Sequence, residues 1–121
     1  MTPRRDPQSQ LPLTPVVVHI LIALSDGERH GYAIAQEIEA TTQGQIRMGP
    51  GTLYGSIQRM LSSDLIEEAA ARRRASDADD ERRRYYRMTT FGRRVLDAEL
   101  ERLNAVVRLA RQKHLPGGAR A

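Results

Sequence analysis

The last part of the chain carries the pattern that most restricts its fold. We expect a helix from an N-cap at Thr89 to about His114, and apolar residues recur along it at steps of 4, 3, 4 and 3. These residues are Leu96, Leu100, Leu103, Val107 and Ala110. This is the spacing of a coiled-coil seam. Because so long a helix at the end of a 121-residue chain has little of its own chain to bury the seam, the sequence predicts that a partner chain covers it.

Composition limits the class of protein. The chain has the length of one domain, and it contains no Cys, which excludes disulfides and thiolate metal sites. No apolar stretch approaches the roughly 18 residues of a membrane helix, and the N-terminus lacks the apolar segment of a signal peptide, so we expect a cytoplasmic protein without membrane contact. Of its 19 basic residues, 18 are Arg. Arginine matches phosphates and guanine edges, so this bias fits a nucleic-acid partner, although an Arg-rich codon preference would produce the same count.

The first half of the chain predicts a flexible arm followed by helices. Residues 1–12 are polar and carry three Pro, which favours an arm. A first helix should begin after an N-cap at Thr14, with Pro15 at its first position, and end at the turn 25–27. A second helix should span about 31–42, and a third follows after a short connection. In such three-helix units the last helix enters the DNA groove.

The stretch from Met48 to Leu61 is the candidate for that last helix. Its apolar residues, Leu53, Ile57, Met60 and Leu61, fall on one helical stripe. The opposite side is small and polar, which suits the DNA major groove better than the Glu- and Lys-rich face of most soluble helices. The start of the helix also offers backbone N–H groups to an anion. The candidate DNA contacts here are Gly51, Thr52, Tyr54, Gly55, Ser56 and Arg59. The alternative is a loop followed by an ordinary packing helix. In that case the Tyr54 ring packs against its neighbours and does not contact DNA.

After this helix, the spacing of the side chains changes from the helical period of about 3.6 residues to the pattern of extended strands. We expect strands over 65–70 and 82–89, joined by a long charged loop, which is a hairpin of the kind called a wing. Candidate phosphate contacts flank the loop at Arg73, Arg74, Arg82 and Arg83. The alternative is a solvated loop in which the acidic residues of 77–81 neutralise these arginines. A helix over 67–74 is also compatible with its Ala, Glu and Arg content, but the Tyr-rich second strand needs a partner.

Several motifs, in this order along the chain, resemble those of the PadR family of transcriptional regulators. They are DGERHGYAI after the first helix, GPGTLYG followed by Arg59, SSDLIEE, and DDERRRYYRMT with TFG and a long helix. The resemblance covers roughly Leu13 to Leu109, and linked motifs are more specific than any one alone. It implies a homodimer with a winged helix-turn-helix that binds an inverted-repeat operator in double-stranded DNA, usually as a repressor released by a small molecule. One departure is the wing tip, 75–81, which is more acidic than a tip that grips the minor groove.

The resemblance also implies roles for individual residues. In PadR-like proteins the Tyr of the HGY motif, here Tyr32, contacts the DNA backbone, and the helix N-terminus beside it favours the same negative charge. The alternative is a half-buried Tyr packed under the third helix. For the dimer, we expect Val16 and Ile20 of the first helix to help cover the seam. Some small PadR relatives stack flat drugs between Trp side chains, and this chain has no Trp. A cleft lined by Leu, Val and Ala would bind a small apolar or aromatic effector.

Together these patterns predict a mainly α fold with a small β-hairpin, built as a winged helix-turn-helix plus a long C-terminal dimerisation helix. The predicted parts are a flexible arm over 1–12, a DNA-binding domain over 13–89, a dimerisation helix over 90–115 and a disordered tail over 116–121. The short single C-terminal helix is similar to that of the smaller PadR subgroup. We expect no cofactor and no metal site.

Two rival classes of function were weighed. An enzyme needs a nucleophile, a base and an orienting group, or a metal set, but His19, His30 and His114 are scattered and there is no Cys to join them. The second rival is a protein-interaction module or scaffold built on a winged-helix domain, whose last helix binds a partner or an anionic membrane. Glu99 and Glu101 interrupt the basic face that a membrane-binding helix requires.

Overall fold

The structure, a computed structural model, describes residues 5–69 and 84–114. In these ranges the elements are, in order, η1 (Pro7–Gln10), α1 (Pro15–Ala23), β1 (Arg29–His30), α2 (Gly31–Thr41), α3 (Pro50–Ser62), β2 (Ile66–Glu68), β3 (Tyr85–Met88) and α4 (Thr90–Gln112). The predicted fold class, mainly helical with a small hairpin, is confirmed. The predicted tail and the wing arginines, Arg73, Arg74, Arg82 and Arg83, lie outside the described residues.

Side chains cap the starts of three α-helices. Thr14 Oγ1 and Thr89 Oγ1 each accept a hydrogen bond from the backbone N–H three residues ahead, at 3.3 and 2.8 Å. Both were predicted as N-caps, and both are confirmed. At α2 the cap is His30, whose Nδ1 accepts a hydrogen bond from the backbone N–H of Ala33 at 3.2 Å. His is not among the residues preferred as N-caps, so the sequence pattern did not point to it.

The described strands form one antiparallel sheet in the order β1-β3-β2. In the central strand, Tyr86 pairs with Arg29 on β1 and with Glu68 on β2. Glu67 Oε2 and Arg87 Nε lie 2.8 Å apart across β2 and β3, as expected for opposite charges at facing positions. The two strands of the predicted hairpin are confirmed. Strand β1 was not predicted, because two residues carry no measurable periodicity.

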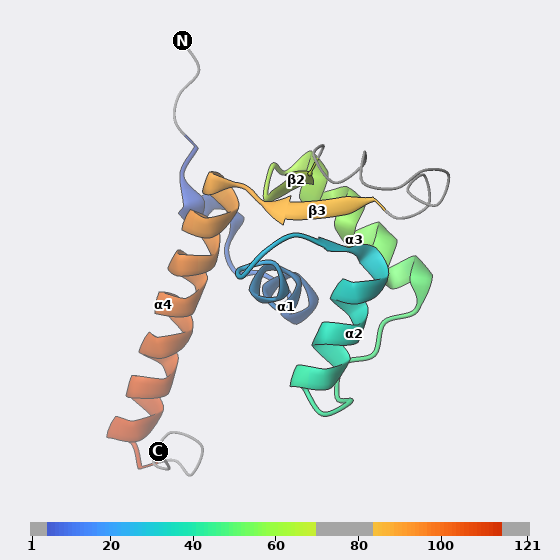
Figure 1. Cartoon of the computed structure of the whole chain (residues 1–121). Coiled ribbons are helices and arrows are strands. Elements are labelled where there is room, and N and C mark those ends of the chain that lie inside the picture. Colours follow the sequence, from blue (N-terminus) through green and yellow to red (C-terminus); the bar gives the residue numbers. More distant parts are fainter. Residues whose placement is uncertain (1–4, 70–83, 115–121) are drawn as a thin grey trace.

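Helix α1 forms the centre of the domain. Figure 1 shows it between α4 on one side and α2 and α3 on the other, and it contacts all three of these helices. Its sequence, PVVVHILIA, is apolar on almost every side, as a helix surrounded by others requires. The most deeply buried apolar side chains of the core are Ile20, Leu21, Ile34, Ile38, Ile57, Met60, Ile66 and Val95. Burying each of them stabilises the fold by roughly 1.5 to 3 kcal/mol.

Helix α4 has a buried part and an exposed part. Its first turns bury Val95, Leu96 and Glu99 against the domain, whereas every residue from 100 to 109 is exposed. Figure 1 shows the second part projecting beyond the rest of the domain. Leu96 and Ile20, which were predicted to join the dimer seam, are only 4% and 0% exposed and belong to the chain's own core. Those two predictions are wrong because α1 and α4 contact each other and cover these side chains.

The start of α4 is joined to the chain just after α3 by a close backbone contact. The backbone N–H of Thr89 donates to the Leu65 carbonyl at 3.1 Å, and its hydroxyl donates to the Asp64 carbonyl at 2.6 Å. One turn further, a Cβ added to Gly92 would overlap the carbonyl oxygen of Leu65 and lie 3.1 Å from Cγ of Met88. Only glycine allows α4 to approach the backbone this closely.

The described part of the predicted flexible arm, residues 5–12, lies against α4. Helix η1 contacts α4, and Arg5 reaches further, to the end of α3. Arg5 NH1 donates to the Ser63 carbonyl at 2.9 Å, and its NH2 lies 3.1 Å from Asp64 Oδ2. Its guanidinium also lies 5.5 Å from the centroid of the Phe91 ring. These contacts hold residues 5–12 in place, and their partners are too distant in sequence for a local pattern to reveal them.

Glu99 is a buried carboxylate at the point where the N-terminal segment meets α4. It is 1% exposed, and it accepts hydrogen bonds from Arg102 Nε and NH2 at 2.7 and 3.0 Å. Its Oε2 also accepts one from the backbone N–H of Leu13 at 3.3 Å. The hydrogen bonds from Arg102 hold the pKa of the Glu99 carboxyl below its ordinary value of 4.5, although burial acts in the opposite direction. Glu99 therefore ties the N-terminal segment to α4 as a charged group.

We expect Glu99→Gln to lower the free energy of unfolding by about 1 to 2 kcal/mol at neutral pH, because the amide keeps the shape but loses charge-assisted hydrogen bonds. A carboxyl whose pKa is lowered by folding stabilises the protein above its unfolded-state pKa, and this contribution is lost as pH falls through the folded-state pKa. The difference in Tm between wild type and variant should therefore shrink below pH 4.5.

Thermal unfolding followed by circular dichroism at several pH values checks this expectation. Glu101→Gln is the matched control, because it removes an exposed carboxylate from the same helix and should change Tm little. An equal Tm difference between wild type and Glu99→Gln at neutral pH and at about pH 3.5 would contradict a role for the charge.

Candidate nucleic-acid interface

The first turns of α2 and α3 lie next to each other, since Tyr54 of α3 contacts Gly31 of α2. Neither first turn contains an acidic residue. The N-cap of helix α3 is Gly49, which offers no side-chain cap, and a Cβ added to Gly49 or Gly51 would meet open space. The first backbone N–H groups of α3 are therefore accessible to an anion, which the helix dipole favours at this end.

Helix α3 has a core face and an outer face, and most of its residues lie on the face that was predicted for them. Leu53, Ile57 and Met60 are buried, and Leu61 is half-buried. The predicted outer residues Gly51, Thr52, Tyr54 and Arg59 are exposed, and Gly55 is half-buried. The outer face therefore combines small groups, hydroxyls and one guanidinium, a set that can contact base edges in a major groove.

Ser56 was predicted on the outer face and is buried instead, at 2% exposure. It follows Leu53 by three residues and precedes Met60 by four, so helix geometry places it between two core residues. Its hydroxyl accepts a hydrogen bond from Arg59 NH2 at 3.2 Å. Ser56 is therefore not available to a groove, but it orients the guanidinium of Arg59, which is.

Tyr32 is the most exposed of the aromatic residues at this surface, at 64%. This exposure excludes the alternative in which it packs, half-buried, under α3. The ring of His30 lies parallel to that of Tyr32, with centroids 6.5 Å apart, and meets the ring of Tyr85 edge-on at 5.4 Å. His30 therefore links the base of the wing to the start of α2, a role that sequence reasoning missed.

Tyr54 is 43% exposed, and its ring lies against the backbone of Gly31. Close to it, on the central strand, Tyr86 is 5% exposed. Burial is the main cause that raises the pKa of the Tyr86 phenol, and the neighbouring Glu68 and Tyr54 raise it further, while Arg84 lowers it. Tyr86 therefore stays a neutral phenol over the physiological range, and it is part of the core that the helices and the sheet share.

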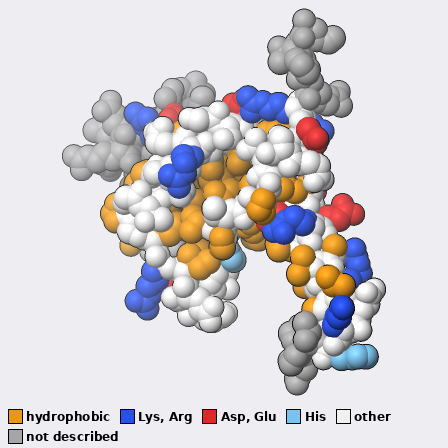
Figure 2. Space-filling view, turned by 180° about the vertical axis from the view of Figure 1, so that it is seen from behind, with side chains coloured by type: hydrophobic (Ala, Val, Ile, Leu, Met, Phe, Trp, Pro, Cys, Tyr) orange, Lys and Arg blue, Asp and Glu red, His pale blue; other side chains and the backbone are white. Residues whose placement is uncertain are grey.

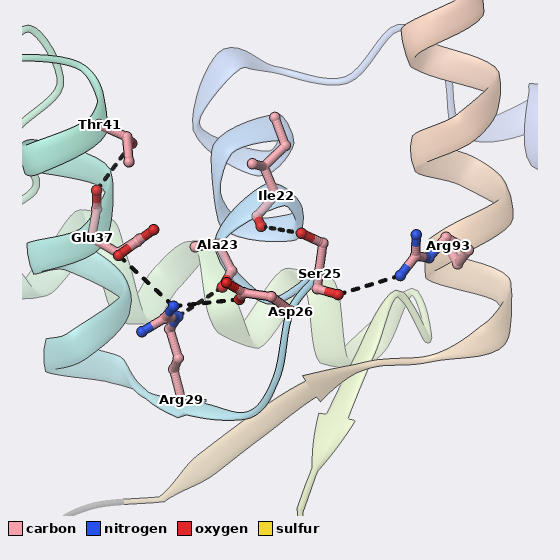
Figure 3. A network of polar contacts seen from close by, with 8 residues as sticks. All are labelled: Ile22, Ala23, Ser25, Asp26, Arg29, Glu37, Thr41 and Arg93. Atoms are coloured by element: carbon pink, nitrogen blue, oxygen red, sulfur yellow. Dashed lines mark hydrogen bonds and ion pairs between the residues drawn. The ribbon is translucent and has the colours of Figure 1, made fainter.

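The turn that leads from α1 into α2 is held by Arg29, as Figure 3 shows. Its Nε donates to the carbonyl of Ala23 at 2.8 Å, and its NH2 lies 3.3 Å from Asp26 Oδ1 and 3.8 Å from Glu37 Oε1. One guanidinium therefore connects the end of α1, the turn and the middle of α2. This positions the start of α2, and the partners of Arg29 were not predictable from spacing alone.

Residues 5–69 and 84–114 contain neither of two other classes of site, a metal centre or a membrane-spanning helix. No three His, Cys, Asp or Glu side chains gather there in an arrangement that could hold a metal ion. None of the helices in those ranges combines the length and the apolar character that crossing a bilayer requires.

Residues 20–98 match the model of the transcriptional regulator PadR-like family. The chain belongs to this family. In this PadR-like protein, α2 and α3 are the helix-turn-helix pair, and β2 and β3 are the strands of the wing. Membership makes the chain a DNA-binding transcriptional regulator rather than an enzyme.

Solved structures share the fold of this PadR-like chain. A transcriptional regulator from Clostridium thermocellum is similar with a TM-score of 0.66 and 24% identity, over 80% of this chain and 90% of that one. A PadR family transcription regulator from Clostridium difficile is similar with a TM-score of 0.65 and 22% identity, over 82% of this chain and 97% of that one. In sequence, a 37.1 kDa protein in transposon TN4556 of Streptomyces fradiae is 45% identical over 47 residues. These are 39% of this chain and only 13% of that protein.

Proposed function

We propose that this PadR-like protein is a cytoplasmic repressor that binds an inverted-repeat operator as a homodimer and is released by a small molecule. The observation that carries the proposal is the outer face of α3, where an accessible helix N-terminus and the exposed Arg59 stand beside the start of α2. No acidic residue in either first turn opposes a phosphate backbone. The combination of phosphate contact and base contact is what sequence-specific DNA recognition requires.

Each residue of the interface takes one of two roles in this proposal. Tyr32 and the α2 N-terminus contact phosphate, and so does Gly51 through its backbone N–H. On α3, Thr52, Gly55 and Arg59 face base edges, and the guanidinium of Arg59 suits the two acceptors of guanine. The wing arginines, Arg73, Arg74, Arg82 and Arg83, would add phosphate contacts.

The proposed dimer is supported by the exposed part of α4. Leu100, Leu103 and Val107 are 37% to 40% exposed, and the adjacent Val106 and Leu109 are more than half exposed. Figure 2 shows apolar side chains along the projecting helix and across the neighbouring face of the domain. Of the other predicted dimer residues, Ala110 and Val16 are half-buried. Exposed apolar side chains gathered in this way are typical of an association site.

A dimer would also supply the binding strength and the place for an effector. One winged domain contacts a single half-site, whereas two domains related by a two-fold axis present their α3 helices about 34–36 Å apart, one turn of DNA. A cleft between the two α4 helices would be lined by Leu, Val and Ala. We therefore propose a small apolar or aromatic effector that binds there and changes the spacing of the half-sites.

The function is tested by measuring binding to duplex DNA fragments over a range of salt concentrations. A regulator should prefer one promoter fragment, and its affinity should fall steeply with salt, with a slope of about 0.9 per phosphate neutralised. Binding that is equally weak on every fragment would favour the rival proposal, a protein-interaction scaffold.

The roles within the interface are tested by two substitutions. Arg59→Ala should weaken operator binding by about 1 to 3 kcal/mol and relax the preference at one base pair, because one base contact is lost. Tyr32→Phe should weaken all sequences alike, because a phosphate contact carries no sequence information. Arg108→Ala, which removes an exposed arginine from α4, is the charge-matched control. Equal and uniform losses from Arg59→Ala and Tyr32→Phe would contradict base contact by Arg59.

The dimer is tested by Leu100→Glu combined with Leu103→Glu. Two carboxylates in the seam should produce a monomer that has lost operator binding, because burying an unpaired charge opposes association. Analytical ultracentrifugation gives the mass, and circular dichroism checks that the domain remains folded. Arg108→Glu introduces the same side chain elsewhere on the exposed part of α4 and serves as the control. A folded double variant that stays dimeric and binds DNA normally would show that the interface lies elsewhere.

A further inference from the structure

Gly31 matters for the space that it leaves, not for its backbone conformation. It is the buried first residue of α2, and its φ is not among the positive values of the chain. A Cβ added there would lie 2.6 Å from Oη of Tyr54 and 2.9 and 3.0 Å from Cε1 and Cζ of the same ring. Real Cβ atoms essentially never approach other atoms closer than 3.0 Å. The Tyr54 ring therefore occupies the volume that any larger residue at position 31 would need.

On the central strand, burial raises the pKa of the Tyr86 phenol, and the neighbouring Glu68 and Tyr54 raise it further. Tyr86 lies on the central strand, opposite Arg29 of β1 and Glu68 of β2. Arg29 also holds the turn before α2, so the helix start on which the Tyr54 ring lies is tied to the end of α1 and to the middle of α2.

This contact lies between the two surfaces that the proposed function uses. Tyr32 follows Gly31 directly and is exposed, and Thr52 precedes Tyr54 by two residues and is also exposed. Any change in the volume between Gly31 and Tyr54 therefore has two outcomes. Either α2 moves relative to α3, or the ring of Tyr54 swings away from Gly31. Both outcomes disturb simultaneous contact with a phosphate and with the groove.

We infer that Tyr54 is a positioning residue whose ring, seated on Gly31, sets the distance between the phosphate-contacting start of α2 and the groove-facing side of α3. The inference rests on the proposed function and deepens it, because it gives Tyr54 a role other than reading a base. It also gives a reason for glycine at this position, because a Cβ there would overlap the Tyr54 ring.

The inference is tested by a double-mutant cycle on operator affinity, with wild type, Gly31→Ala, Tyr54→Ala and the double variant. Gly31→Ala alone should weaken binding about tenfold, because its methyl group displaces the ring. In the Tyr54→Ala background the same substitution should change affinity by less than about twofold, because no ring remains to be displaced. Tyr54→Phe, which keeps the ring, should bind close to wild type. Gln36→Ala, an exposed substitution on α2, is the control.

A second measurement separates positioning from general damage. For variants that circular dichroism shows to be fully folded, Gly31→Ala should also lower the salt dependence of binding, because a phosphate contact from α2 is lost. An equal loss from Gly31→Ala in both backgrounds would mean that the DNA backbone, not Tyr54, requires the glycine, and this would overturn the inference. No loss in either background would overturn it as well. If wild type itself shows no preference among DNA fragments, the proposed function fails first, and the positioning role fails with it.

Discussion

Thr89 and Gly92, at the start of α4, contact the backbone of Asp64 and Leu65, just after α3. This contact determines how α3 and α4 are oriented relative to each other. Asp64 and Leu65 follow the end of α3, and Thr89 and Gly92 lie at the start of α4, so the two backbone segments meet with only the Thr89 hydroxyl bonded between them. A backbone contact leaves little room for adjustment, unlike a contact through long side chains. Because the far part of α4 projects from the domain, a small rotation at this joint would move its end a long way. The joint therefore sets where a partner chain would hold the second α3.

Ion pairs neutralise much of the positive charge on the described surface of this Arg-rich chain. Many of the described arginines lie beside carboxylates on the body of the domain, namely Arg5, Arg29, Arg47, Arg84, Arg87 and Arg102. Exposed pairs of this kind add little stability, but they neutralise the surface that they cover. Arg59 differs, because its hydrogen-bond partner is the neutral hydroxyl of Ser56. Within residues 5–69 and 84–114, the positive charge of Arg59 therefore faces no carboxylate within ion-pair distance.

Much of the fold could be predicted from local pattern. The caps at Thr14 and Thr89 depend on residues within one turn, and the apolar stripe of Leu53, Ile57 and Met60 depends on the helical period, so both were predictable. The two wing strands followed from the change of period after α3. The family resemblance, carried by motifs in the correct order, is confirmed by the match over residues 20–98. On α3, Thr52, Tyr54 and Arg59 are exposed as expected.

The remaining features depend on neighbours that are distant in the sequence. A helical period fixes the angle between side chains, but the width of the buried arc depends on which other helices cover it. Ile20 and Leu96 were therefore misplaced, since both lie where α1 and α4 contact each other. Ser56 is different, because its spacing from the core residues of its own helix already placed it on the core side of α3. The contact of Gly31 with Tyr54 joins two helices, and no spacing within either one encodes it. Local chemistry therefore determined which elements form and where they begin, and only packing between them decided which side chains remain available to DNA.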